Sequence, residues 1–204
     1  MIADVPVFCV CGPSAAGKTT FVERLSRRLV DRGITSLPIS CDNYYRSNWI
    51  PDPSFGFDTV AAIDTRALRQ DLRAARRQEA DSLRHYDMAL RRVSRRPITR
   101  RYDVILLEGS YGPQDLLGDV PLTGLIYLQT SIHLRLIRRL RRDVQERRRS
   151  PRYVIRQMLR EMLPAEEAFI HPLRSQADLV VRDHSRGIEA VLQRIDHAHC
   201  ADPG

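Results

Sequence analysis

Lysine is nearly absent from this 204-residue chain. Its 33 basic residues include a single lysine, Lys18, and are otherwise arginines. This scarcity argues against a regulatory GTPase, because the usual guanine-reading motif of that class, N-K-x-D, needs a lysine in addition to one in a phosphate-binding loop. It also raises the question of why an ammonium is kept at position 18 when guanidinium groups are used everywhere else.

Long apolar runs are also absent. No stretch approaches the ~18 residues that span a bilayer, and a hydrophobic content of 43% is ordinary for a globular protein. The amino-terminal segment has no basic region of the signal-peptide kind, and Cys9, Cys11 and Cys41 lie in or beside apolar runs where reduced thiols act as small hydrophobes. We therefore expect a cytoplasmic protein with no membrane partner, folded as a single domain over residues 1–204.

Signatures of nucleic-acid-binding domains are missing as well. The formal net charge of +8 and the arginine-rich stretches 91–101 and 138–149 are compatible with a nucleic-acid surface. Acidic residues are interspersed throughout, however, and no helix-turn-helix, zinc-finger or RRM pattern is present. We do not expect nucleic acid as a partner, and an arginine-rich nucleic-acid-binding ATPase is kept only as an alternative.

Apolar, strand-like segments alternate along the chain with helix-like segments, which is the pattern of an α/β fold with a parallel sheet. The predicted strands are 5–11, 34–40, 103–108, 123–129 and 177–181, and the predicted helices are 17–31, 60–79 and 133–148. A further helix is expected to start at Ser150 and Pro151, an N-cap residue followed by proline at the first position, and to be interrupted at Pro164.

A phosphate-binding loop lies between the first strand and the first helix. The stretch GPSAAGKTT at 12–20 matches the pattern G-x-x-x-x-G-K-T in the expected context. Its glycines let backbone N–H groups turn toward phosphates, and Lys18 supplies a compact ammonium that follows charge during transfer more easily than a planar guanidinium. We expect a nucleotide to be bound by Gly12, Ser14, Ala15, Ala16, Gly17, Lys18, Thr19 and Thr20.

Two acids follow predicted strands, and parallel strands bring their carboxyl ends to one edge of a sheet. Asp42 follows the second strand, and Glu108 closes the segment DVILLEG. We expect Asp42 to accept the proton of a substrate hydroxyl, and Thr19, Asp42 and Glu108 to form the Mg²⁺ site. Either acid alone could instead be a helix cap or a member of a salt bridge.

The predicted helix 133–148 is amphipathic. One face carries Leu134, Ile137, Leu140 and Val144, and the opposite face carries Arg135, Arg138, Arg139 and Arg142. An arginine face is usually a solvated surface. Two helices joined at 147–150 are nevertheless typical of a moving lid, which we place at about 133–163.

An ordered set of motifs carries a family resemblance: GPSAAGKTT, SCDNYYRS, FGFDTVAAID, HYD, VILLEG, RRLRRDVQERRR and HPLRSQADLVV. Over about residues 5–181 the chain resembles the uridine kinase and phosphoribulokinase family of P-loop kinases, especially the uridine-cytidine kinase branch. The resemblance implies a P-loop NTPase fold with a five-stranded parallel core sheet, flanking helices and an arginine-rich helical lid. It also implies transfer of the γ-phosphoryl group from ATP to the 5′-hydroxyl of a nucleoside.

The resemblance assigns roles to individual residues. Asp42 matches the catalytic base, and Arg139 and Arg142 match arginines that clamp the ATP phosphates. Asp58 would hold ribose hydroxyls, and the other substrate-binding residues would be Tyr45, Phe57, Tyr86, Arg149 and Gln157. Most of the acceptor site is expected within an insertion at about 41–101.

The chain departs from the family at the end of the pocket that reads the base. Where the family has an aromatic residue and a histidine after the Y-D pair, this chain has Met88 and Arg91. Arginine only donates hydrogen bonds and is permanently charged, so we expect uridine and cytidine to be poor acceptors and a modified nucleoside or another acidic, oxygen-rich alcohol to be preferred. Alternatively, Arg91 points into solvent. A sugar phosphate or pantothenate is another candidate acceptor, and a homo-oligomer is compatible with the resemblance.

Overall fold

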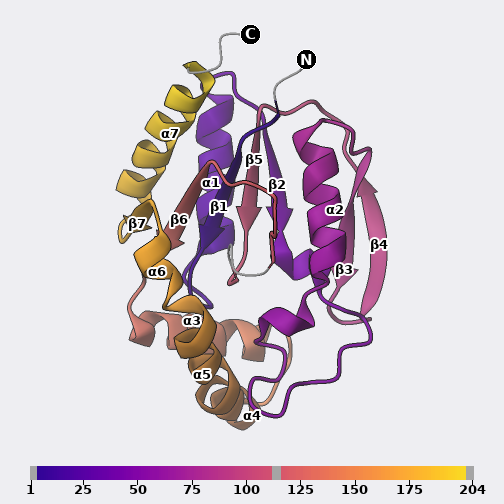
Figure 1. Ribbon diagram of the computed structural model, residues 1–204. Coiled ribbons are helices and arrows are strands. Elements are labelled where there is room, and N and C mark those ends of the chain that lie inside the picture. The colour runs from indigo at the N-terminus through magenta and orange to yellow at the C-terminus, as the bar shows by residue number, and fades with distance from the viewer. Residues whose placement is uncertain (1–3, 112–115, 201–204) are drawn as a thin grey trace.

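The structure is a computed structural model that describes residues 4–111 and 116–200 (Figure 1). One parallel sheet contains the strands β1 (Val7–Cys11), β2 (Ser36–Ser40), β5 (Val104–Glu108), β6 (Gly124–Leu128) and β7 (Leu179–Val181), in the order β2-β5-β1-β6-β7. Neighbouring strands are all parallel. The predicted five-stranded parallel core is therefore confirmed, with slightly narrower strand bounds.

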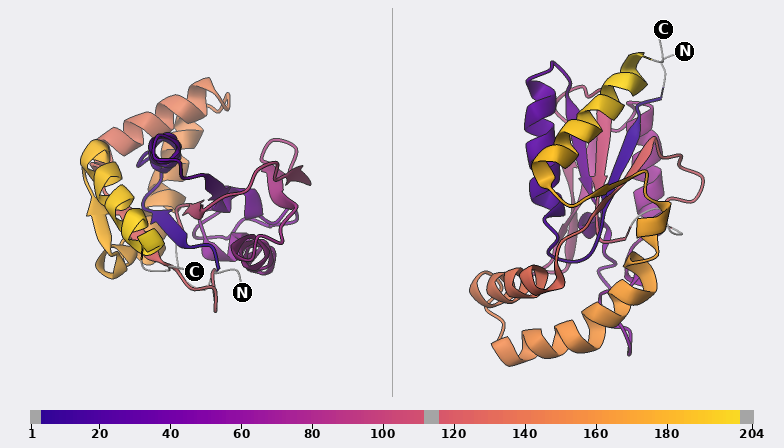
Figure 2. Two further views of the ribbon diagram at one scale, coloured as in Figure 1. Left: turned by 90° about the horizontal axis from the view of Figure 1, so that it is seen from above. Right: turned by 90° about the vertical axis from the view of Figure 1, so that its left-hand side faces the viewer.

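Helices cover both faces of this sheet (Figure 2). The helices α1 (Lys18–Val30) and α7 (His184–Cys200) pack on one face through leucine, isoleucine and valine side chains, and α2 (Thr65–Arg76) packs on the other. Every residue of β1, β5 and β6 is buried because both faces are covered. The predicted helix 60–79 is a short 3₁₀ turn, η2 (Val60–Ala62), followed by α2, whose N-cap is Asp64.

The lid is a pair of helical arms beyond the carboxyl edge of the sheet (Figures 1 and 2). The first arm is α3 (Ile132–Gln145). The second runs through α4 (Pro151–Gln157), η3 (Met158–Met162), α5 (Leu163–Ala165) and η4 (Glu166–Ile170) and leads to α6 (Leu173–Gln176). The predicted interruption at Pro164 is wrong, because η3 and η4 are π-helical. Their wider turns accommodate a residue that has no N–H and crowds the preceding turn.

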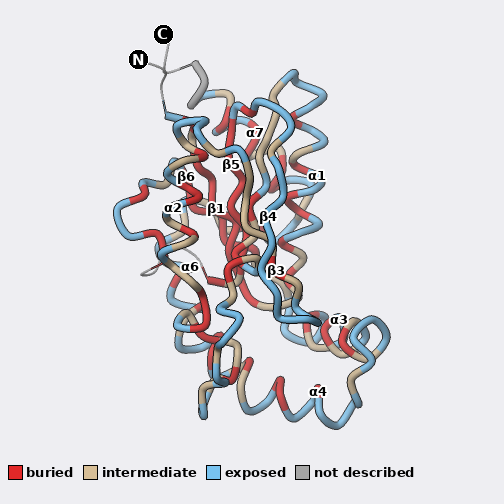
Figure 3. The backbone as a smooth tube through the Cα atoms, turned by 90° about the vertical axis from the view of Figure 1, so that its right-hand side faces the viewer, coloured by how far each residue is buried: buried red, intermediate tan, exposed pale blue. Residues whose placement is uncertain are grey.

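A two-stranded antiparallel hairpin was not predicted from the sequence. It consists of β3 (Ser82–Asp87) and β4 (Arg92–Pro97). Every residue of β4 is exposed, as the pale tube in Figure 3 shows, so the strand lacks the alternation of apolar and polar residues that marks a half-buried strand. The hairpin forms one wall of the site described below.

None of the helices in the described part of the chain combines the length and the apolar character needed to cross a membrane.

Candidate active site

A cleft of about 510 Å³ lies between the phosphate loop, the segment after β2, the β3-β4 hairpin and the lid. It brings together residues that are far apart in the sequence. Of the predicted site residues, those that line it are Ser14, Ala15, Gly17, Lys18, Thr19, Thr20, Asp42, Tyr45, Phe57, Asp58, Tyr86, Met88, Arg91, Glu108, Arg139, Arg142, Arg149 and Gln157. The other two, Gly12 and Ala16, belong to the phosphate loop but do not line the cleft.

The phosphate loop requires glycine at both ends of its pattern. Gly12 has φ of 138° and Gly17 has φ of 91°, values that L side chains rarely adopt. A Cβ atom on Gly12 would also lie 2.6 Å from the carbonyl oxygen of Leu128 on β6. The loop therefore lies directly against the sheet, and α1 begins immediately after it at Lys18.

Lys18 is buried and turns back over the phosphate loop. Its Nζ donates hydrogen bonds to the carbonyl oxygens of Gly12 at 2.9 Å and Pro13 at 3.0 Å, and to Oγ of Ser110 at 3.2 Å. Burial lowers the pKa of Lys18, while the charges of Glu108 and Asp42 act in the opposite direction. The three oxygen atoms that accept from Nζ are uncharged, so a phosphate oxygen in the cleft would be a stronger acceptor for this ammonium.

Glu108 and Asp42 form the acidic side of the site. Glu108 ends β5 and accepts a hydrogen bond from Oγ1 of Thr19 at 3.3 Å, and Asp42 lies in η1 (Cys41–Tyr44) directly after β2. Burial, and then the charge of Asp42, raises the pKa of Glu108. A cation would relieve this unfavourable charge.

The donor set fits Mg²⁺. Among the described residues there is no cluster of three or more His, Cys, Asp or Glu suited to a metal ion, but Mg²⁺ usually takes only one or two protein carboxylates and completes its shell with water and phosphate oxygens. Thr19, Asp42 and Glu108 carry oxygen atoms that could serve as ligands in this mode of binding.

Aromatic residues line the opposite end of the cleft, where the acceptor is expected. The rings of Tyr45 and Tyr86 are tilted toward each other with centroids 6.2 Å apart. Arg91 lies in the hairpin turn, and its guanidinium is 5.5 Å from the centroid of the Phe57 ring and donates to the carbonyl oxygen of Trp49 at 2.6 Å. Arg91 is exposed, and its guanidinium lies at the rim of the cleft against Phe57 and the carbonyl oxygen of Trp49.

Asn43 and Arg84 fasten the hairpin to the segment after β2, and sequence reasoning missed both. Oδ1 of Asn43 accepts from the backbone N–H of Tyr86 at 3.2 Å. Arg84 donates to the carbonyl oxygens of Asn43 and Tyr45 at 3.1 and 2.8 Å and pairs with Asp64 at 3.2 Å. The position of Tyr86 in the cleft therefore depends on these two anchors.

The faces of α3 differ from the sequence prediction. Arg135 and Arg139 are only 3% and 6% exposed, whereas Leu134 and Ile137 are 51% and 64% exposed. The apolar stripe that packs on α4 and η3 consists instead of Leu136, Leu140 and Val144. Arg135 and Arg139 do not lie on a solvated surface, because Glu166 of the second lid arm and Asp58 of the cleft pair with them, whereas Arg138 of the same predicted face is exposed.

Asp143 on α3 gathers four arginines. Its side chain is fully buried, and Arg139, Arg142, Arg147 and Arg149 have nitrogen atoms between 3.0 and 3.8 Å from its oxygens. Burial, and then the charge of Arg142, lowers the pKa of Arg147. One carboxylate cannot neutralise four guanidinium groups, so this part of the lid presents excess positive charge to the cleft.

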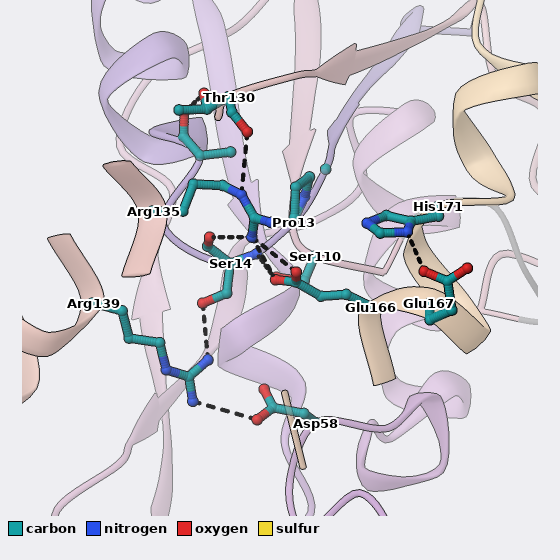
Figure 4. Close-up of polar contacts among 12 residues, drawn as sticks. Pro13, Ser14, Asp58, Ser110, Thr130, Arg135, Arg139, Glu166, Glu167 and His171 are labelled. Atoms are coloured by element: carbon teal, nitrogen blue, oxygen red, sulfur yellow. Dashed lines mark hydrogen bonds and ion pairs between the residues drawn. The ribbon is translucent and has the colours of Figure 1, made fainter. Parts of the chain in front are cut away.

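Arg139 connects three elements of the site (Figure 4). Its Nη1 donates to Oγ of Ser14 at 3.0 Å, and its Nη2 lies 3.3 Å from Oδ2 of Asp58. The cleft also contains Gly109, Ser110, Arg138 and Arg147, which were not predicted. Ser110 lies two residues after the predicted Glu108. Its place just beyond the end of a strand is the sequence feature that could have identified it as a cleft residue.

Comparisons with known proteins agree with this geometry. Residues 7–187 match the model of the "Phosphoribulokinase / Uridine kinase family". The chain is 30% identical over 191 residues to a uridine kinase of Leuconostoc citreum, covering 91% of this chain and 90% of that one, and 32% identical over 181 residues to a uridine kinase of Lactobacillus johnsonii, covering 84% and 83%.

A solved structure shares the fold. A Silicibacter sp. TM1040 protein assigned as a fructose transport system kinase has a TM-score of 0.71 at 17% identity, with 87% of this chain and 90% of that chain covered. The family match spans most of the chain and includes the phosphate loop, both acids and the lid. The chain therefore belongs to the phosphoribulokinase and uridine kinase family.

Proposed function

We propose that this protein transfers the γ-phosphoryl group of ATP to a hydroxyl group of a nucleoside-like acceptor. The observation that carries the proposal is the single cleft in which the phosphate loop, the acid Asp42 and the lid arginines face one another. Kinases need little more than this, because phosphoryl transfer depends mainly on positioning and on stabilising charge.

In the proposed step, Asp42 accepts the proton of the acceptor hydroxyl. The hydroxyl oxygen forms a bond to the γ-phosphorus while the bond from that phosphorus to the β-phosphate oxygen breaks, and ADP leaves. Mg²⁺, held by Thr19, Asp42 and Glu108, would neutralise phosphate charge when it is bound. Lys18 is positioned to follow the charge as it moves between the phosphates.

The lid arginines provide the remaining positive charge. Arg142, Arg147 and Arg149 surround Asp143 at the cleft, and together they exceed the charge of that carboxylate. They would hold the charge of the transferring group in a site that closure keeps from water. The lid would thereby favour transfer to the acceptor over hydrolysis.

A second cleft, on the other side of Pro13, suits the base and ribose of the donor. It is lined by Pro13, the start of α3 and the segment Arg182 to Ser185, and Arg138 lines both clefts. A nucleotide whose phosphates lie on Ser14 to Thr19 would extend into this second cleft, leaving the Tyr45 end of the first one free for the acceptor.

The preferred acceptor is proposed to carry an anionic or strongly hydrogen-bond-accepting group. Arg91 lines the cleft, where its guanidinium contacts a carbonyl oxygen and the Phe57 ring, neither of which neutralises its charge. A carbonyl, carboxylate or phosphate oxygen on the acceptor would do so. Met88 provides an adaptable apolar wall in place of a stacking ring.

The arginine-rich stretches support a small-molecule site over a nucleic-acid surface. In 138–149, Arg139, Arg142, Arg147 and Arg149 line the cleft; all four lie close to the buried Asp143, and Arg139 also pairs with Asp58 of the cleft. In 91–101, Arg95 pairs with Asp71 at 3.0 Å and Arg96 contacts His85. Arg95 and the four lid arginines therefore have acidic partners within the protein.

The test is ADP release with Mg-ATP across a panel of nucleosides, nucleoside antibiotics, pantothenate and sugar phosphates. We expect release to require an acceptor and to be lost in Asp42→Asn. The control variant is Asp31→Asn, which changes an exposed acid at the end of α1. Stimulation by DNA or RNA in place of an acceptor, with a steep salt dependence, would support the nucleic-acid-binding ATPase instead.

A further inference from the structure

Ser14 of the phosphate loop is bound to the lid through each of its three polar groups. Its N–H donates to Oε1 of Glu166 at 2.8 Å, its carbonyl oxygen accepts from Arg135 at 3.2 Å, and its Oγ accepts from Arg139 at 3.0 Å. Figure 4 shows the arginines and the glutamate converging on this residue.

Arg135 and Glu166 are themselves a buried ion pair. Nη1 of Arg135 lies 2.8 Å from both carboxylate oxygens of Glu166, and both residues are only 3% exposed. Nε of Arg135 also donates to the carbonyl oxygen of Thr130 at 3.3 Å, just before α3 begins. A buried pair of this kind persists only when hydrogen bonds satisfy its remaining polar atoms, and Ser14 and Thr130 contribute to this.

The position of the pair in the lid is informative. Arg135 lies in the first turn of α3, and Glu166 begins η4, near the end of the returning arm. The pair therefore joins the two ends of the lid to each other and to the phosphate loop. The arginines around Asp143 lie farther along the lid, beyond this joint.

We infer that Arg135 and Glu166 are positioning residues that hold the phosphate loop and the lid arginines in a fixed arrangement relative to each other. This inference rests on the proposed function. The pair fixes the Ser14 peptide on both sides, so the loop keeps its shape when the distal lid moves, and Arg139 reaches the phosphates from a fixed starting point one helical turn after Arg135. Neither residue needs to touch a substrate for this role.

The decisive variant is Arg135→Met/Glu166→Leu. Replacing both charges with apolar side chains of similar volume avoids an unpaired buried charge, so the fold should be retained, as a melting temperature close to wild type would verify. We expect kcat to fall ~10²-fold, because small misplacements of catalytic groups have effects of that size. In Glu166→Gln, whose amide oxygen still accepts from Ser14, we expect kcat to fall less.

Hydrogen exchange of the 12–19 segment gives a readout that does not depend on turnover. We expect the double variant to lose protection of the Ser14 amide and to bind Mg-ATP more weakly, as measured by calorimetry. The matched controls are Glu167→Gln, which changes the exposed partner of His171, and Arg141→Gln, which changes an exposed arginine of α3; both should behave as wild type.

A folded double variant with wild-type kcat, Mg-ATP affinity and exchange would overturn the inference and leave the pair a purely structural contact. If the wild-type protein released no ADP with any acceptor, the proposed function would fail. The positioning role of the Arg135–Glu166 pair would then still be tested by hydrogen exchange of the Ser14 amide and by Mg-ATP binding. The double variant should again lose protection of that amide and affinity for Mg-ATP.

Discussion

The guanidinium of Arg139 on the lid pairs with the carboxylate of Asp58 on the acceptor segment, with Nη2 3.3 Å from Oδ2. Their side chains are only 7% and 21% exposed. We expect Arg139 to bind donor phosphates and Asp58 to bind acceptor hydroxyls. A donor phosphate that binds Arg139 would therefore release Asp58, and an acceptor hydroxyl that binds Asp58 would release Arg139. Binding of either ligand would free the side chain that binds the other ligand.

The lid arginines are expected to act mainly in the transition state. Arg139→Ala and Arg142→Ala should each lower kcat more than they raise the KM for ATP, because the charge they hold is greatest on the transferring group. Steady-state kinetics measure both parameters, with Arg141→Ala as the control from the exposed side of the same helix. Unchanged kcat and KM in both variants would show that these arginines do not act in the transition state.

Substitutions of Lys18 and of Asp42 are expected to differ in their effects on ATP binding and on the rate of transfer. Lys18→Ala should abolish transfer and weaken ATP binding, because Nζ lies at the phosphate loop. Asp42→Asn should lower the rate by ~10² to 10⁴, as loss of a general base typically does, with a smaller effect on ATP affinity. Calorimetry with Mg-ATP and a rate assay separate the two. Near-normal turnover in Asp42→Asn would show that the base has been misassigned.

Arg91 is expected to set acceptor preference. Arg91→Ala should lower kcat/KM by ~10- to 10²-fold for an anionic acceptor, the size of a hydrogen bond to a charged group, and should have little effect with uridine. Arg92→Ala is the control, since Arg92 is exposed and does not line the cleft. A kcat/KM for uridine in the usual ~10⁴ to 10⁸ M⁻¹s⁻¹ range, unchanged in Arg91→Ala, would indicate ordinary uridine recognition.

Glu108 is expected to link stability to pH. Burial and the charge of Asp42 raise its pKa, so its favourable contribution to stability is present below the unfolded pKa and is lost as the pH rises through the folded pKa. Glu108→Gln stays neutral, and it should melt above wild type at about pH 8 but not at about pH 4.

Mg²⁺ gives the complementary test of the Glu108 site, because it should raise the wild-type melting temperature at the higher pH and leave that of Glu108→Gln unchanged. The exposed Glu146→Gln serves as the control. A Glu108→Gln variant that melts below wild type at the higher pH would contradict the account.

Much of the core was readable from the sequence because its signals are local. Three of the core strands are buried apolar runs, and the spacing of Gly12, Gly17 and Lys18 identifies the phosphate loop. The acids Asp42 and Glu108 were found because parallel strands deliver their ends to one edge. These features require no knowledge of distant partners.

The missed features depend on partners far along the chain. Glu166 contacts Ser14 across 152 positions, and nothing near Glu166 in the sequence marks that contact. Likewise, β4 has no buried face, and β3 is held by the Asn43 side chain. The predicted apolar face of α3 was wrong at Leu134 and Ile137, which are exposed because buried carboxylates attract Arg135 and Arg139 and override the usual rule that charged faces point to solvent.

The most direct test of the central claim follows the γ-phosphoryl group itself. Phosphorus NMR of wild-type protein with Mg-ATP and the acceptor panel should show ADP and a new phosphate monoester forming in equal amounts, and Asp42→Asn should form neither at a comparable rate. ADP and inorganic phosphate without a phosphorylated acceptor, or an unchanged rate in Asp42→Asn, would contradict the proposal that this cleft is the active site of a small-molecule kinase.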